Sequence, residues 1–200
     1  MILKIFYLST LLSLLFAALG CKEIPLETQI LKIQQDASLD LNSAVSKVLP
    51  LIFPYVLKEW KLEQEETSKL WVLRATYGGN TALTFDSQKE YADNLMRIHA
   101  MYSSQLAAAF SQLPIKEIRL SLSKPLYVKG ENHPDVGIQE FEIFRTALST
   151  DKAKAILSEK NATSPFAGFK DHKKELLDLF GKMQGAWTVE LNQLDQITVE

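Results

Sequence analysis

Residues 87–123 read SQKEYADNLMRIHAMYSSQLAAAFSQLPIKEIRLSLS, a helical pattern that runs directly into a strand pattern. Ser87 and Glu90 have the spacing of a capping box, in which two side chains satisfy free N–H groups at a helix start. An apolar stripe follows at helical spacing, and Pro114 ends it: Tyr91, Leu95, Ile98, Tyr102, Leu106, Ala109 and Leu113. Beyond it, apolar and polar residues alternate, as in a strand with one buried and one solvated face: Ile118, Arg119, Leu120, Ser121, Leu122 and Ser123.

Strand patterns lie on both sides of this stretch. Residues 70–77 are rich in β-formers, and Gly78-Gly79-Asn80 separates them from residues 81–85. Glycines supply the positive φ that tight hairpin turns need, so we expect 70–77 to pair with 81–85. Further strands are predicted at residues 126–128, which extend the strand beyond Pro125, at 138–146 and at 187–191.

Helical patterns complete the chain. Residues 26–48 carry apolar side chains alternately three and four apart, which predicts one helix that Pro50 ends. Residues 49–62 fit either a helix or an extended segment, because they are apolar and interrupted by Pro50 and Pro54. Shorter helices are expected at 150–159 and 171–183. The order predicts an α+β domain over residues 27–200, an antiparallel sheet with helices packed on one face.

The composition is that of a globular protein with no sign of a nucleic-acid partner. Of the 200 residues, 46% are hydrophobic and 23% are charged, and the net charge is −2. Basic residues form no cluster, which argues against nucleic acid. Cys21 is the only cysteine, so a disulfide within the chain is excluded, and no sequence motif indicates a metal or another cofactor.

The N-terminus has the layout of a secretory signal. Lys4 precedes an apolar run over residues 5–19, and Gly20 is a small residue directly before Cys21. The run is shorter than the roughly 20 apolar residues that a membrane span requires. Ala18-Leu19-Gly20-Cys21 resembles the lipobox of bacterial lipoproteins, with its first two residues in the reverse of the usual order.

The resemblance implies a lipid anchor. A signal peptide over residues 1–20 would be cleaved after Gly20, Cys21 would carry the acyl chains, and residues 21–26 would form a tether to the membrane. By the same resemblance, Lys22 in place of Asp favours an outer over an inner membrane of the cell envelope. Two alternatives remain open: an ordinary secretory signal whose cleavage leaves a free thiol, and an uncleaved anchor helix.

Few residues stand out as candidates for a site. The loop residues Glu131, Asn132, His133 and Asp135 gather polar groups that suit a cation or a polar ligand, although they also suit a simple hairpin turn. Among the tryptophans, Trp60 is the best candidate for an exposed contact, because charged residues surround it. His99 lies beside the helix stripe, and we expect it to make a hydrogen bond at the surface.

No catalytic motif is present, so whether the chain is an enzyme is left open. The first hypothesis is an envelope lipoprotein whose domain, without catalysis, binds or supports a protein or polymer partner. The alternative is an envelope hydrolase that acts on cell-wall or sugar substrates through carboxylates or His133.

Overall fold

The structure, a computed structural model, describes residues 24–79, 88–130, 133–160 and 162–194, without the side chains of residues 88 and 126–138. The helices are α2 (Leu26–Gln35), α3 (Leu41–Ile52), α4 (Gln88–Phe110), α5 (Thr150–Leu157) and α6 (Lys173–Ala186). The strands are β1 (Leu57–Gln64), β2 (Trp71–Tyr77), β3 (Ile115–Gly130), β4 (His133–Ser149) and β5 (Thr188–Asn192). None of the helices in these ranges combines the length and the apolarity needed to cross a bilayer.

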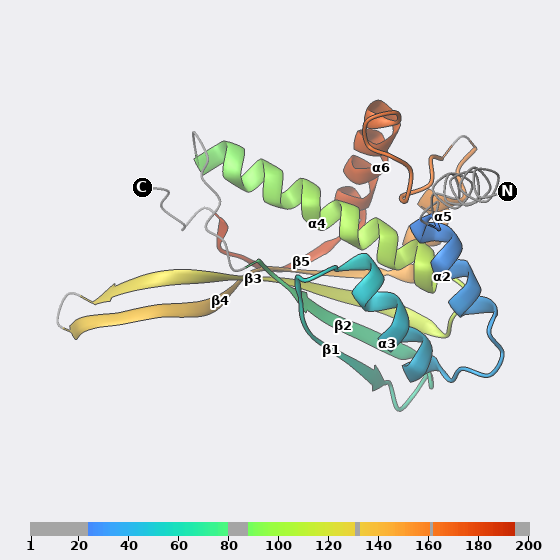
Figure 1. Ribbon diagram of the computed structural model, residues 1–200, viewed down its shortest axis with the longest axis horizontal. Coiled ribbons are helices and arrows are strands. Elements are labelled where there is room, and N and C mark those ends of the chain that lie inside the picture. The colour runs from blue at the N-terminus through green and yellow to red at the C-terminus, as the bar shows by residue number, and fades with distance from the viewer. Residues whose placement is uncertain (1–23, 80–87, 131–132, 161, 195–200) are drawn as a thin grey trace, which may run out of the picture.

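The strands form one open sheet in the order β1-β2-β3-β4-β5. Helices cover one of its faces (Figure 1), and the predicted α+β class is confirmed. The sheet is mixed, however, because β2 and β3 run parallel while the other three pairs are antiparallel. The reason is the long helix α4 between β2 and β3, which carries the chain back across the sheet as parallel strands require.

The core lies between α4 and the covered face of the sheet. Leu106, Ala107 and Phe110 are buried on α4, and Ile118, Leu120 and Leu122 are buried on β3 below them. The predicted central helix and the strand after it are therefore confirmed. Full burial of a leucine or phenylalanine side chain stabilises the fold by about 1.5–3 kcal/mol.

The expected helix over residues 26–48 is wrong, because the chain forms two helices with a break at residues 36–40. The Asp36 side chain accepts a hydrogen bond from the Ser38 backbone N–H at 3.0 Å, and Asp40 accepts one from the Ser43 N–H at 2.7 Å. Asp40 thereby caps a new helix start, which competes with a continuous helix. Pro50 does not end α3 but lies inside it, so the helix continues to Ile52 without the hydrogen bond that the missing N–H would make.

The expected hairpin of residues 70–77 with 81–85 is also wrong. β2 has β1 on one side and β3 on the other along its whole length, so both of its edges are taken. Residues 81–85 lie outside the described residues. The actual hairpin joins β1 to β2 through residues 65–70, where Lys69 adopts a positive φ of 58°. Residues 49–62, left open above, divide into the end of α3, a turn and most of β1.

The hairpin of β3 and β4 extends beyond the rest of the sheet as a two-stranded arm (Figure 1). The last pair of β2 with β3 is Tyr77 with Leu122, and β5 pairs with β4 no further than Phe144. Beyond these points the two strands have no other partner among the described residues and pair with each other as far as Gly130 with His133. The expected extension of β3 through residues 126–128 is confirmed.

Candidate functional site

Of the predicted ligand loop, His133 lies at the end of the arm, where its backbone pairs with Gly130. Glu131 and Asn132 fall outside the described residues, and His133 and Asp135 belong to β4 without described side chains. Strand β4 therefore begins at His133, inside the polar stretch that was expected to form the loop. Its role as a binding loop stays a prediction.

Trp60 lies on β1, at the edge of the sheet. Its side chain is half-buried and packs against the hydrophobic core, and the residue also borders the polar face of the sheet. Its role as a contact residue stays a prediction.

The uncovered face of the sheet carries three arginines from three adjacent strands. Arg74 on β2 and Arg119 on β3 are direct cross-strand neighbours, and Arg145 on β4 pairs with Ser121, two residues along β3 from Arg119. They line a shallow trough of about 420 Å³ together with hydroxyl, acidic and other side chains: Glu59, Trp60, Lys61, Thr76, Ser121, Ser123 and Glu142. We call this site the arginine trough.

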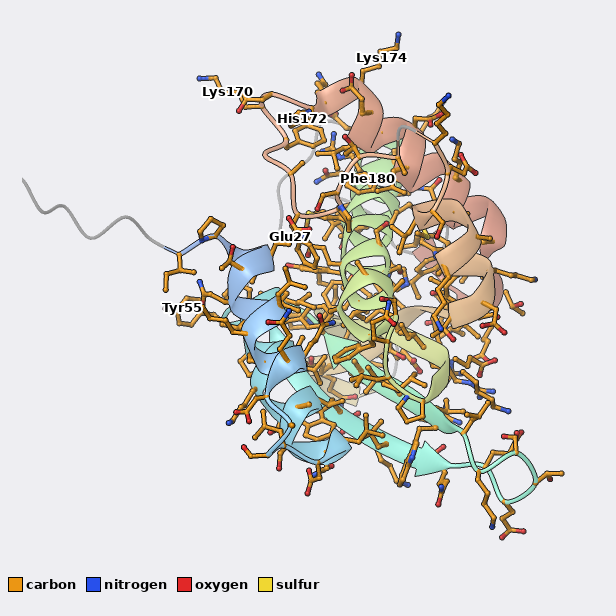
Figure 2. All side chains as sticks on the ribbon, turned by 90° about the vertical axis from the view of Figure 1, so that its right-hand side faces the viewer. Glu27, Tyr55, Lys170, His172, Lys174 and Phe180 are labelled. Carbon is orange, nitrogen blue, oxygen red and sulfur yellow. The ribbon has the colours of Figure 1, made fainter. Side chains whose placement is uncertain are left out.

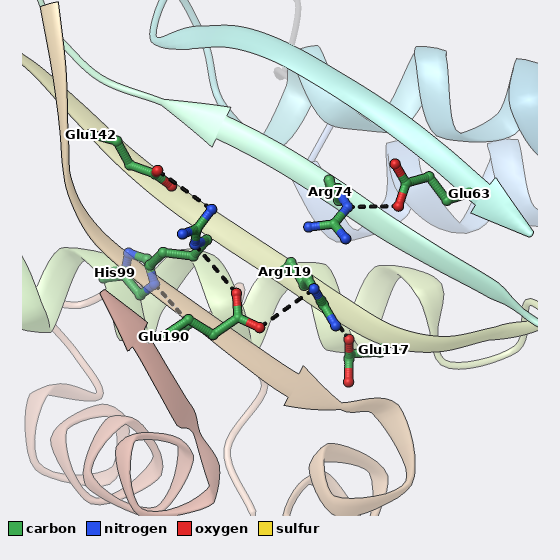
Figure 3. A network of polar contacts seen from close by, with 9 residues as sticks. Glu63, Arg74, His99, Glu117, Arg119, Glu142 and Glu190 are labelled. Atoms are coloured by element: carbon green, nitrogen blue, oxygen red, sulfur yellow. Dashed lines mark hydrogen bonds and ion pairs between the residues drawn. The ribbon is translucent and has the colours of Figure 1, made fainter. Parts of the chain in front are cut away.

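Glutamates from four strands hold these guanidinium groups in place (Figure 3). Arg74 donates through Nε to Glu63 at 2.7 Å, and Arg119 donates through Nε to Glu117 at 2.7 Å. Glu190 on β5 lies between Arg119 and Arg145. Its carboxylate is 3.5 Å from Arg119 Nη1 and 3.3 Å from Arg145 Nε. Glu142 lies 3.5 Å from Arg145 Nη1. Hydrogen bonds thus orient the guanidinium groups of Arg74 and Arg119, whereas Arg145 is held by ion pairs alone.

The electrostatics of the trough follow from this arrangement. Two like charges directly opposite each other in a sheet are destabilising, so the pair Arg74–Arg119 requires its flanking glutamates. The hydrogen bond from Arg74, followed by that from Lys61, holds the pKa of Glu63 below its usual range. The hydrogen bond to Glu117 raises the pKa of Arg119. The side chains remain partly open to solvent, so each ion pair contributes only about 0–1 kcal/mol.

The trough carries the groups that recognise an oxyanion. Four basic and two acidic side chains line it. An arginine bound at Nε still presents other N–H groups, and these suit the paired oxygens of carboxylate or phosphate.

His99 is fully buried on the other face of the sheet, so its expected surface hydrogen bond is wrong. Its Nδ1 lies 3.1 Å from the Tyr77 hydroxyl, and its Nε2 lies 2.8 Å from Thr146 Oγ1. The rings of Phe144 and Trp187 enclose it edge-on, at centroid distances of 4.9 and 5.1 Å. Burial lowers the pKa of His99 to about 3. The imidazole is therefore a neutral structural group, sealed away from any substrate.

Within the described residues, no group of three or more histidine, cysteine, aspartate or glutamate side chains is arranged to hold a metal ion. Comparison of the chain with family models, curated proteins and solved structures finds no match.

The sequence did not predict the arginine trough, although the strand face that carries part of it was predicted. The alternation around Arg119 and Ser121 predicts a solvated strand face, and the structure places both residues there. Arg74 and Arg145 join them only because β2 runs parallel to β3 and β4 folds back along it. Sequence spacing does not reveal those neighbours, because they depend on the path of α4.

Proposed function

We propose that this chain is an envelope lipoprotein, anchored through Cys21, whose domain binds a ligand or partner at the arginine trough without catalysis. The observation that carries the binding role is the convergence of Arg74, Arg119 and Arg145 on one uncovered sheet face. Supporting it, four glutamates hold these groups in fixed positions, and fixed arginines lose less side-chain entropy on binding.

The ligand or partner would present carboxylate or phosphate oxygens together with hydroxyl or amide groups. The oxygens would contact the guanidinium groups, while Thr76, Ser121 and Ser123 offer hydroxyls nearby. The glutamates around the trough would repel a dense polyanion, so isolated acidic groups on a polar surface fit better. This chemistry agrees with an acidic polymer or an acidic patch on another envelope protein.

The anchor is supported by the lipobox-like tetrad that ends at Cys21. Each buried methylene of an acyl chain contributes about 0.8 kcal/mol, so several chains hold a protein at a bilayer almost permanently. We expect Cys21→Ser to move the protein from the detergent phase to the aqueous phase in a phase-partition assay. A mutant that has lost residues 1–20 and still partitions like the parent would refute the lipid anchor.

The binding role is tested by titrating the protein with inorganic phosphate and, separately, with succinate, while following the arginine Nε–H signals by NMR. We expect millimolar binding that shifts the signals of Arg74, Arg119 and Arg145. Arg119→Gln should weaken this binding at least about tenfold, because a charge-assisted hydrogen bond contributes about 1.5–3 kcal/mol.

Arg97→Gln is the matched control. Arg97 lies on α4, where its guanidinium stacks over Phe169 at 5.9 Å, away from the trough. This variant should bind both anions as the parent does. If the anions shift none of the arginine signals, or if Arg119→Gln binds them as the parent does, the trough is only a solvated network of ion pairs. The anion that binds more tightly, phosphate or succinate, shows whether the ligand presents phosphate or carboxylate groups.

A further inference from the structure

The tether places a strict limit on how far the domain stands from its membrane. Three residue steps separate Cys21 from Ile24, the first described residue. Fully extended chain spans at most about 3.6 Å per residue, so these two Cα atoms lie within about 11 Å in any conformation. If Cys21 carries acyl chains, Ile24 therefore lies within about 11 Å of the anchored residue, a distance comparable to the thickness of one headgroup layer.

The entry to α2 and the outer face of this helix each carry an apolar side chain that the domain does not cover. Ile24 and Leu31 are 47% and 46% exposed, whereas Ile30 on the inner face is buried. Ile24 lies two residues before α2, next to the capping residue Pro25, and its carbonyl accepts a hydrogen bond from Gln29 Nε2 at 2.7 Å. This hydrogen bond links the backbone before the helix to a side chain in the first half of the helix.

A third uncovered apolar residue is Tyr55, in the turn between α3 and β1. It is the most exposed large hydrophobic residue of the described chain, and its φ is 65°. A positive φ is uncommon for a bulky residue and costs on the order of 1–3 kcal/mol. Tyrosine favours the boundary between lipid and water, because its ring is apolar and its hydroxyl is polar.

Tyr55 and the start of α2 lie on the same side of the molecule. Figure 2 shows the labelled side chain of Tyr55 projecting on the side where the chain enters α2. The two sites belong to different segments of the sequence, so the tether alone does not account for Tyr55. Together they define a surface of Ile24, Leu31 and Tyr55, which we call the anchor-side surface.

We propose that the anchor-side surface rests on the bilayer and inserts Ile24, Leu31 and Tyr55 into its interface. This inference rests on the proposed lipid anchor and adds a fixed orientation to it. The uncovered sheet face points away from the helices and not toward Tyr55 (Figures 1 and 2). In this orientation the arginine trough therefore stays open to the aqueous phase beside the membrane.

The experiment uses the fact that Cys21 is the only cysteine. Once it is acylated, a newly introduced cysteine is the one free thiol of the mature chain. Leu31→Cys and Tyr55→Cys are each labelled with a nitroxide in the lipidated protein on phosphatidylcholine vesicles. Electron paramagnetic resonance then measures how readily oxygen and a water-soluble nickel complex reach the label. Leu177→Cys, on the exposed side of α6, is the control.

We expect the nickel complex to reach labels at positions 31 and 55 several-fold less readily than the label at position 177, and oxygen to reach them more readily. Equal access at all three positions, on protein that floats with the vesicles, would overturn the orientation but leave the anchor intact. Failure of every variant to float with the vesicles would instead refute the anchor, and with it the orientation.

Discussion

Lowering the pH from about 7.5 to about 5 should reduce the free energy of unfolding by about 2 kcal/mol, because His99 cannot take up a proton in the folded protein. In the unfolded chain its pKa is about 6.5, whereas in the fold burial lowers it to about 3. The folded pKa is the lower one. The stability that His99 confers is thus complete above pH 6.5 and is lost as the pH falls from there toward 3.

The loss is about 1.4 kcal/mol for each pH unit below 6.5. Urea denaturation at a series of pH values, followed by circular dichroism, measures it directly. The window above pH 5 is chosen because most carboxylates remain ionised there.

Two variants separate His99 from other causes. His99→Gln keeps groups that can bond Tyr77 and Thr146 but cannot titrate, so it should lower the stability at pH 7.5 and remove most of the pH dependence. His172→Gln replaces an exposed histidine at the start of α6 and should keep the slope of the parent. A parent protein of constant stability across this window would show that His99 is accessible to protons.

Gly78→Ala should lower the free energy of unfolding by about 3 kcal/mol, because the space for a side chain is filled by backbone. A Cβ at Gly78 would lie 2.0 Å from the Ser123 carbonyl oxygen. Neither partner can move easily, since the Gly78 N–H also donates to the Val56 carbonyl at 2.9 Å, where β1 begins. The melting temperature should fall by about 10 °C.

Gly181→Ala is the matched control, with the same chemical change in open surroundings. Gly181 lies inside α6, and a Cβ there meets nothing within 4 Å. Alanine favours a helix by about 1 kcal/mol over glycine, so this variant should be slightly more stable than the parent. If Gly78→Ala were equally harmless, the close packing of β2 against β3 would be incorrect.

The parts of the fold that the sequence predicts are those with local causes. The stripe on α4 and the alternation through Ile118 and Leu122 depend on one face meeting a core, and both appear as expected. The break between α2 and α3 depends on the side chains of Asp36 and Asp40, which outweigh a continuous apolar spacing. Local patterns therefore have to be read together with the capping residues that interrupt them.

The partners of each strand could not be predicted, because they depend on contacts between distant segments. The glycines after Tyr77 indicated a turn to a following strand, but β1 and β3 fill both sides of β2. The arginine trough has the same origin, since Arg74 meets Arg119 only through the parallel pairing. The burial of His99 likewise needs Tyr77 and Thr146, which come from two different strands.

The membrane anchor is the claim on which the proposed function and the orientation both depend. Mass spectrometry of the mature N-terminal peptide, isolated from cells fed with labelled fatty acid, tests it most directly. The account predicts a peptide that begins at Cys21 and carries the mass of the added acyl chains. A mature chain that begins at another residue, or one whose Cys21 has no added mass, would contradict it.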